Sequence, residues 1–112
     1  MLKRFLKNNS TPETDVASVV QALDAKSAQI VDVREHNEWN EGHIPGAIHI
    51  PLGELPARLA ELDSQRPVIT VCRSGRRSLK AAEQLLAGGF QDAKSLAGGM
   101  IDWTKSGQRV ER

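Results

Sequence analysis

The chain has 112 residues, a single cysteine and a net charge of +1 at pH 7. This length fits one domain that buries about two-thirds of its unfolded surface and needs no disulfide or metal to fold. A single cysteine excludes an internal disulfide, a paired-cysteine redox motif and a cysteine-based zinc site. The 15 basic and 14 acidic residues nearly balance, which argues against binding nucleic acid through a broad basic face.

Short segments at both ends are expected to flank the domain: one tail over residues 1–10, a second over 109–112, and the domain over 11–108. Residues 1–9 begin with basic side chains but lack the apolar core of a signal peptide, so a loose tail is favoured over weak contact with an anionic membrane. No apolar run approaches the ~20 residues that cross a bilayer. The single cysteine must also stay reduced, with a free thiol. Together these features predict a cytoplasmic protein without stable membrane association.

The first predicted element is a helix that begins near Thr11. Thr11 supplies a capping hydroxyl, Pro12 suits the first helical position, and Glu13 puts an acid in the first turn. Apolar residues at helical spacing over 16–23 give this helix one face with which to cover a sheet. Residues 28–33 follow as a buried strand, because their apolar residues form a nearly continuous run.

The next elements are short. Residues 35–41 are predicted to form a short helix or turn held in place by Trp39, and residues 42–47 a turn containing glycine and proline. A short strand over 47–50 follows, and regularly spaced leucines predict a helix over 52–62.

The second half of the chain alternates strands and helices. A β-branched strand over 68–71 is followed by a polar loop, a helix from about Arg77 that stops at two glycines, and a strand over 93–96. A glycine loop then leads to a final helical turn, in which Trp103 either lines the site or, as is more usual, seals the core. This alternation predicts an α/β fold with a mostly parallel sheet, helices on both faces and right-handed crossovers.

The loop after the 68–71 strand carries Cys72 at the carboxyl end of the strand. Open α/β sheets bind ligands at this edge, because loop amides and the start of the next helix point at the same place. The helix dipole and nearby cations lower the pKa of a cysteine, so we expect Cys72 to be largely thiolate. Arg73, Arg76 and Arg77 supply the cations, and their paired N–H donors suit an oxyanion. The loop therefore predicts a nucleophile that attacks a small anionic substrate.

A lone cysteine after a buried strand is more often an inert small hydrophobe than a catalyst. Here Ser74 and Gly75 provide a small polar residue and a residue free to adopt positive φ, as a tight turn requires. A cysteine kept only for packing does not need such a turn, a helix start and three arginines around it. We therefore favour the catalytic interpretation.

Asp32 and Arg34, at the end of the first buried strand, are interpreted as a structural ion pair or loop anchor rather than as catalytic groups. His43 is the candidate general base. However, a thiolate of lowered pKa needs no base, and a histidine between glycine and proline turns more often bonds the backbone, so a structural role is favoured. His36 and His49 share no ligand spacing with His43, so we expect no metal site and no cofactor.

From about Thr11 to Trp103 the chain resembles the rhodanese domain. Three segments carry the resemblance: residues 30–34 with Glu38 and 42–47, residues 72–78, and residues 96–100 with Trp103. The resemblance implies a single rhodanese-like domain with a five-stranded, mostly parallel sheet flanked by helices. It also implies a sulfurtransferase that works through a cysteine persulfide.

By the same resemblance, Cys72 carries the persulfide inside a cradle of loop amides. The residues implied in substrate binding are Arg73, Ser74, Gly75, Arg76 and Arg77. The residues implied as structural support are Asp32, Arg34, His43 and Ser78. The thiolate would attack the outer sulfur of thiosulfate, a small dianion, and expel sulfite. Cyanide or a thiol, including that of a sulfur-relay protein, would accept the sulfur from outside the chain, because the sequence holds no second cysteine.

Two alternative functions stay open at this point. Phosphatases and arsenate reductases use a similar loop, but they carry arginine where this chain has Ser78, and Arg77 comes one residue early. The shorter loop is tighter and, by family analogy, fits sulfur rather than phosphate. The other alternative is a non-enzymatic rhodanese-fold module for binding or regulation, against which Cys72 and its arginines argue.

Overall fold

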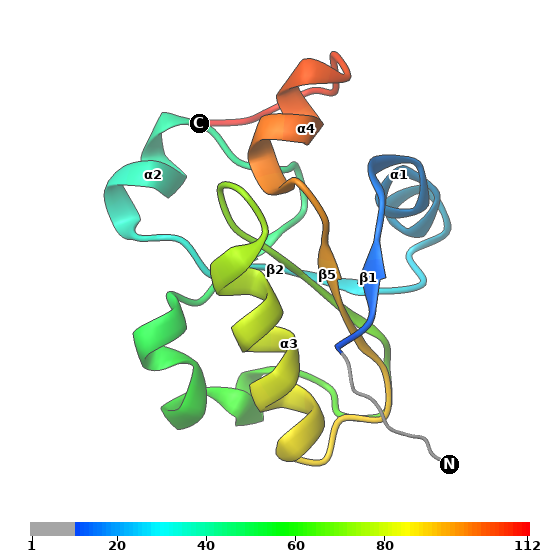
Figure 1. Ribbon diagram of the computed structural model, residues 1–112, viewed down its shortest axis with the longest axis vertical. Helices are drawn as coiled ribbons and strands as arrows, with labels where there is room; N and C mark the ends of the chain where they lie inside the picture. Colours follow the sequence, from blue (N-terminus) through cyan, green and yellow to red (C-terminus); the bar gives the residue numbers. More distant parts are fainter. Residues whose placement is uncertain (1–10) are drawn as a thin grey trace, which may run out of the picture.

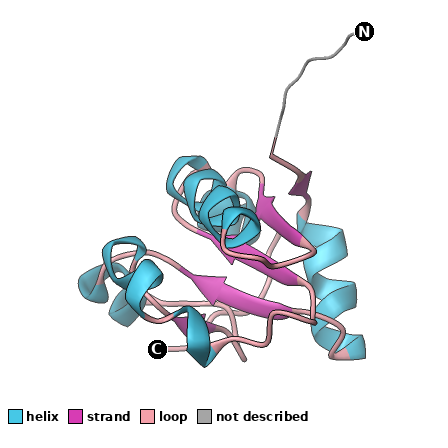
Figure 2. Cartoon of the chain, turned by 90° about the horizontal axis from the view of Figure 1, so that it is seen from below, coloured by secondary structure: helices cyan, strands magenta, loops and turns pink. Residues whose placement is uncertain are grey.

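Five parallel strands form one sheet in the order β1 (Glu13–Thr14), β5 (Ala93–Leu96), β4 (Val68–Val71), β2 (Gln29–Asp32), β3 (Ile48–His49). The computed structural model describes residues 11–112, and the predicted tail over residues 1–10 lies outside the described residues. Figures 1 and 2 show helices on both sides of the sheet. The predicted α/β class, with five parallel strands and helices on both faces, is confirmed.

The element boundaries are as follows. The strands are β1 (Glu13–Thr14), β2 (Gln29–Asp32), β3 (Ile48–His49), β4 (Val68–Val71) and β5 (Ala93–Leu96). The α-helices are α1 (Val16–Ala25), α2 (His36–Glu41), α3 (Arg76–Ala87) and α4 (Gly99–Lys105). Two short 3-10 helices are η2 (Leu52–Ala57) and η3 (Leu59–Glu61). None of the helices within residues 11–112 is long and apolar enough to span a bilayer.

Two apolar layers hold the helices against the sheet. One layer packs α3, η2 and η3 against one face, and the other packs α1 and α4 against the opposite face. Strand β4 serves both layers, because successive side chains point to opposite faces of a strand. Val68 and Cys72 belong to the α3 layer, whereas Ile69 and Val71 belong to the α1 layer. This alternation turns the Cys72 side chain toward α3.

The helix predicted to start near Thr11 begins later in the structure. Asp15 is the N-cap of α1, and its carboxylate accepts a hydrogen bond of 2.9 Å from the backbone N–H of Ser18. The residues before it form β1 at the edge of the sheet, where the Ser95 N–H donates to the Pro12 carbonyl at 3.0 Å. Pairing with β5 therefore overrides the local helix-start signal, which was wrong in position.

The single helix predicted over residues 52–62 is also wrong, since two 3-10 helices occupy this segment. Pro56 lies inside η2 and has no N–H to donate to an α-helical ladder. The chain breaks at Arg58 before η3 begins. Leu55 and Leu62 nevertheless reach the core as their spacing predicts, because burial depends on the apolar pattern rather than on the helix type.

Residues 109–112, the predicted C-terminal tail, pair with the segment after α2. The His43 N–H donates to the Glu111 carbonyl at 2.8 Å, and the Glu111 N–H returns a bond of 2.9 Å to the His43 carbonyl. The Arg112 Nε donates to the Glu41 carbonyl at 3.0 Å. This pairing holds the chain end beside α2, as Figure 1 shows.

Candidate active site

The loop between β4 and α3 begins at Cys72 and makes a tight turn. Gly75 is the N-cap of α3 and has a φ of +105°, in the left-handed region that glycine adopts without strain. A Cβ on Gly75 would also approach the backbone nitrogen of Gly98 to 3.3 Å. The strand, the glycine turn and the helix start predicted from the sequence are therefore confirmed, and they aim the first amides of α3 at Cys72.

The Cys72 sulfur accepts hydrogen bonds from two backbone amides of the loop, the Gly75 N–H at 3.1 Å and the Ser78 N–H at 3.3 Å. It is also hydrogen-bonded to the Ser78 hydroxyl, with 3.4 Å between Sγ and Oγ. The residue is only 1% exposed, so the sulfur lies at the bottom of the loop. Burial opposes ionisation, but the hydrogen bonds from the Ser78 hydroxyl and from the backbone of Ser78, Gly75 and Ser74 outweigh it and lower the pKa of Cys72.

The start of α4 supports the outside of the same loop. The Met100 N–H donates to the Cys72 carbonyl at 2.8 Å, and the Ile101 N–H donates to the Arg73 carbonyl at 3.1 Å. Gly99 permits this approach, because a Cβ there would collide with the Cys72 carbonyl. The predicted glycine loop thus reaches the site through backbone contacts, while Trp103 is 2% exposed and seals the core.

The three loop arginines have different surroundings. Both terminal nitrogens of Arg77 donate to Glu38 on α2, at 2.8 and 2.9 Å. These bonds lower the pKa of Glu38 to about 2. Arg73 and Arg76 are exposed at the loop surface. The loop therefore offers two exposed guanidinium groups, while the third joins α3 to α2.

Asp32 and Arg34 form a buried ion pair at the end of β2. The Arg34 Nε lies 3.0 Å from both carboxylate oxygens, and Nη2 lies 2.8 Å from Oδ2. The Arg34 Nη2 also donates to the Gly42 carbonyl at 2.8 Å. Since the guanidinium is occupied by these partners, the geometry supports the structural interpretation of the pair.

His43 belongs to an aromatic stack beside α2. Its ring lies on that of Trp39 with a centroid separation of 3.5 Å and an interplanar angle of 1°. Its Nδ1 lies 3.0 Å from the Trp39 carbonyl, and His49 stacks against Trp39 at 4.7 Å. These contacts agree with a scaffold role for His43. Within residues 11–112, no group of three histidine, cysteine or acidic side chains is arranged to hold a metal ion.

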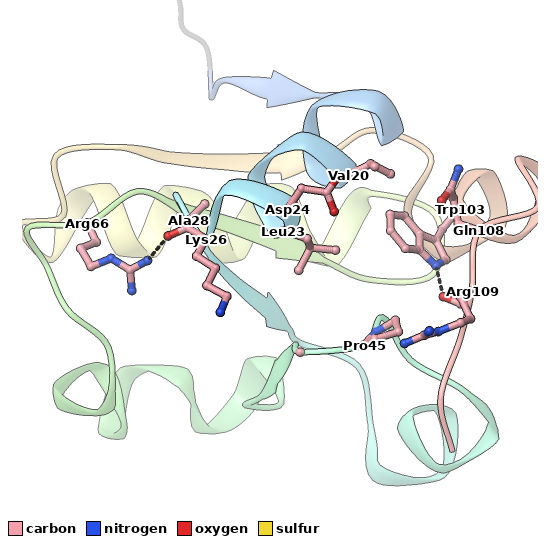
Figure 3. Close-up of a pocket in the computed structure, with 11 residues that line it drawn as sticks. Val20, Leu23, Asp24, Lys26, Ala28, Pro45, Arg66, Trp103, Gln108 and Arg109 are labelled. Atoms are coloured by element: carbon pink, nitrogen blue, oxygen red, sulfur yellow. Dashed lines mark hydrogen bonds between the residues drawn. The ribbon is translucent and has the colours of Figure 1, made fainter.

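Two of the cavities in the described part of the chain bear on the position of the site. One, of about 570 Å³, lies between α1, the turn at Pro45 and the segment at Arg109, with Leu23 and Trp103 among its apolar residues (Figure 3). Its lining includes neither a cysteine nor a serine. The other, of about 360 Å³, is lined by Arg73 and the start of α4 and adjoins the cysteine loop. We therefore centre the candidate site on the loop rather than on the larger cavity.

Sequence reasoning missed two partners of the loop. Ser95 lies under it, with its Oγ 2.7 Å from the Ser78 Oγ, and the only sequence signal is a serine within an otherwise buried strand. Glu38 binds Arg77, which lies 39 positions away in the sequence, and no local sequence pattern predicts that pairing. Both contacts depend on how the sheet and helices are assembled.

A cysteine cradled by amides at a strand-to-helix turn is typical of α/β proteins with thiolate chemistry. A family model described as the Rhodanese-like domain matches residues 15–106, and the chain belongs to that family. The thiosulfate sulfurtransferase GlpE of Shewanella oneidensis is 40% identical over 95 residues, covering 85% of this chain and 94% of that protein.

Other relatives agree with this assignment. The putative sulfur carrier protein YrkF of Bacillus subtilis is 41% identical over 97 residues, which cover 86% of this chain and 52% of YrkF. The chain therefore spans about half the length of that relative. A crystal structure of a rhodanese-related protein from Thermoplasma volcanium has a TM-score of 0.82 at 28% identity and covers 89% of this chain and 97% of that one. The family is thus one of rhodanese-like sulfurtransferases.

Proposed function

We propose that this protein is a thiosulfate sulfurtransferase that carries sulfur as a persulfide on Cys72. The observation that carries the proposal is the set of hydrogen bonds from the Gly75 and Ser78 backbone to the Cys72 sulfur. Together with the hydrogen bond to the Ser78 hydroxyl, which has the largest lowering effect, they lower the pKa of the thiol despite its burial. Since the thiolate is the nucleophilic form of cysteine, this loop prepares Cys72 for attack on a sulfur donor.

The proposed reaction has two steps. The Cys72 thiolate attacks the outer sulfur of thiosulfate; a bond forms between the two sulfurs, the S–S bond of thiosulfate breaks, and its electron pair leaves with sulfite. In the second step, cyanide or a thiolate attacks the outer sulfur of the persulfide. Thiocyanate or a new persulfide leaves, and the Cys72 thiolate is restored. The acceptor comes from outside the chain, because Cys72 is its only cysteine.

Arg73 and Arg76 are the proposed contacts for the sulfonate oxygens of the donor. Both are exposed on the loop and flank the turn at Ser74 and Gly75, and their guanidinium groups suit an oxyanion. For Arg77 we propose a positioning role, since Glu38 occupies both terminal nitrogens. The donor therefore meets two exposed guanidinium groups above a sulfur held by amides.

Entry of the acceptor is proposed through the cavity of about 360 Å³ beside Arg73. Ile101 lines this cavity and, at 40% exposed, is the exposed large hydrophobic residue of residues 11–112. An acceptor that combines a thiol with an apolar part suits this setting. Because the cycle needs a free thiol, we propose that the protein works in the cytoplasm, where thiols stay reduced.

The test is intact-protein mass spectrometry after incubation with thiosulfate. We expect the mass to rise by one sulfur atom, the increase to disappear on adding cyanide with release of thiocyanate, and Cys72→Ala to gain no sulfur. A wild-type protein that gains no sulfur from thiosulfate, a mercaptoacid or a persulfide donor would favour the binding module. Release of phosphate from an aryl phosphate would instead favour a phosphatase, although Ser78 occupies the position where phosphatases carry arginine.

A further inference from the structure

A chain of buried hydroxyl groups runs from Cys72 into the sheet. The Ser78 Oγ lies 3.4 Å from the Cys72 sulfur and 2.7 Å from the Ser95 Oγ. The Ser95 Oγ lies 3.5 Å from the Gly75 carbonyl oxygen. Ser78 and Ser95 are each 0% exposed, so solvent does not compete with these contacts for their hydroxyl protons.

The hydrogen bonds that link these groups can be donated in either of two directions. With a neutral thiol, the S–H donates to Ser78, Ser78 donates to Ser95, and Ser95 donates to the Gly75 carbonyl. With a thiolate the order reverses: Ser95 donates to Ser78, and Ser78 donates to the sulfur. The direction of the Ser95 hydroxyl is therefore linked to the charge of Cys72.

The distances favour the direction that serves the thiolate. The 2.7 Å bond between the two serine hydroxyls has the usual O–H···O length and is made in both directions. The contact that only the neutral-thiol direction uses, from the Ser95 hydroxyl to the Gly75 carbonyl, is 3.5 Å long, at the limit for a hydrogen bond. The Gly75 carbonyl also accepts from the Leu79 N–H at 3.2 Å. It therefore keeps a partner when the Ser95 proton turns toward Ser78, and the reversal leaves no carbonyl unpaired.

We propose that Ser95 is a positioning residue that stabilises the Cys72 thiolate through Ser78. A hydroxyl that receives a hydrogen bond donates a stronger one, so Ser95 both orients Ser78 and strengthens its bond to the sulfur. The proposal deepens the proposed function, because the thiolate that Ser95 supports is the group that would accept sulfur. It gives β5 a role in the chemistry of a loop that starts on β4.

The charged groups on the elements around this loop are unchanged in the variants that test the proposal. They are Arg73, Arg76 and Arg77 on the loop and α3, Glu38 on α2, Asp32 and Arg34 at the end of β2, Lys94 on β5, and Asp102 on α4. Substitution of an uncharged serine therefore changes the hydrogen-bond chain and leaves the formal charges in place.

The experiment measures the thiol pKa of sulfur-free, reduced protein from the pH dependence of its alkylation by iodoacetamide. Ser95→Ala should raise the thiol pKa by roughly half a unit and slow alkylation about threefold below that pKa. Ser95→Val fills the space with methyl groups and should give the same rise, so the measurement survives if the alanine variant is unstable. An unchanged thiol pKa in both variants would overturn the proposal.

Two further variants separate the relay from a general effect on packing. Thr70→Val removes another buried hydroxyl, which donates to the Ser78 carbonyl at 2.7 Å. It should lower stability without moving the thiol pKa. In a Ser78→Ala background, Ser95→Ala should have no further effect, because Ser95 acts through Ser78. An equal shift in both backgrounds would refute the relay.

The thiol pKa measurement tests the role of Ser95 independently of the sulfur-loading test. If no sulfur adduct forms but Ser95→Ala still raises the thiol pKa, the proposed function fails and the relay stands. If sulfur loads normally and the pKa does not move, only the relay fails.

Discussion

Substitution of Asp32 by asparagine tests whether the buried ion pair is structural. Asp32 is 1% exposed and Arg34 is 6% exposed. The carboxylate accepts from the Arg34 Nε, from Nη2 and from the backbone N–H, all within 3.0 Å. Asp32→Asn removes the negative charge and leaves the Arg34 guanidinium buried without a counter-charge.

The expected loss in free energy of unfolding for Asp32→Asn is large for one substitution. Breaking a buried ion pair by removing one partner costs about 3–5 kcal/mol. We expect the lower end, about 3 kcal/mol, because asparagine keeps an oxygen that can accept from the Arg34 N–H. For a domain of this size, that loss lowers the melting temperature by roughly 12–24 °C.

Urea unfolding followed by circular dichroism measures the effect, and the same samples can be tested for sulfur loading. Asp92→Asn is the matched control, because the Asp92 carboxylate pairs with Lys94 at 2.7 Å while both side chains are about 40% exposed. This exposed pair should contribute less than about 1 kcal/mol. An Asp32→Asn protein as stable as the wild type but unable to accept sulfur would show that Asp32 has a chemical role.

Three other predictions concern the surroundings of the loop. Because the pKa of Glu38 is about 2 in the folded protein, against 4.5 for an unperturbed glutamate, its ion pair with Arg77 stabilises the fold above pH 4.5, and this contribution is lost as the pH falls through 2. Glu38→Gln should therefore be about 1 kcal/mol less stable than the wild type in urea at pH 7, and this difference should disappear below pH 2. Gly99→Ala should lower the free energy of unfolding by about 2 kcal/mol or more and slow the alkylation of Cys72, because the added Cβ displaces the Cys72 carbonyl. Arg73→Ala should slow sulfur loading from thiosulfate about tenfold or more, which is equivalent to about 1.4 kcal/mol in the activation free energy. The free energy of unfolding should change by less than ~0.5 kcal/mol.

The glycine and arginine predictions each have a control variant. Gly107→Ala introduces the same side chain at a φ of +78° with nothing within 4 Å, so it isolates backbone strain from the collision at Gly99. Arg66→Ala removes an exposed arginine at the other cavity and should leave sulfur loading unchanged. Equal effects of the two glycine variants, or parallel losses of stability and loading in Arg73→Ala, would contradict the assignments. A constant stability difference for Glu38→Gln across the pH range would contradict the ion-pair argument.

The cysteine loop is the part of the fold that the sequence predicts best. Its strand, its glycine turn and its helix start follow each other directly, and each has its own local signal around Cys72 and Gly75. The pairing of Asp32 with Arg34 is predictable for the same reason, since the two residues lie only two positions apart in the sequence. Local patterns suffice where the interacting groups are close in sequence.

Contacts between distant segments could not be predicted in this way. Strand β1 exists because β5 has an open edge, and the helix-start signal at Thr11 carries no information about that edge. The same holds for Ser95 beneath the loop and for the α4 amides on the carbonyls of Cys72 and Arg73. These contacts depend on the order of strands in the sheet, which a single sequence constrains only through its family resemblance.

The anchoring of Cys72 by α4 has a consequence for the protein during its synthesis. A chain leaves the ribosome from its amino end, so Cys72 emerges before the amides of Met100 and Ile101 that hold its carbonyl and that of Arg73. Until those residues follow, the carbonyls of Cys72 and Arg73 lack these two hydrogen-bond donors. The cysteine loop therefore gains these two backbone anchors only after α4 has been synthesised.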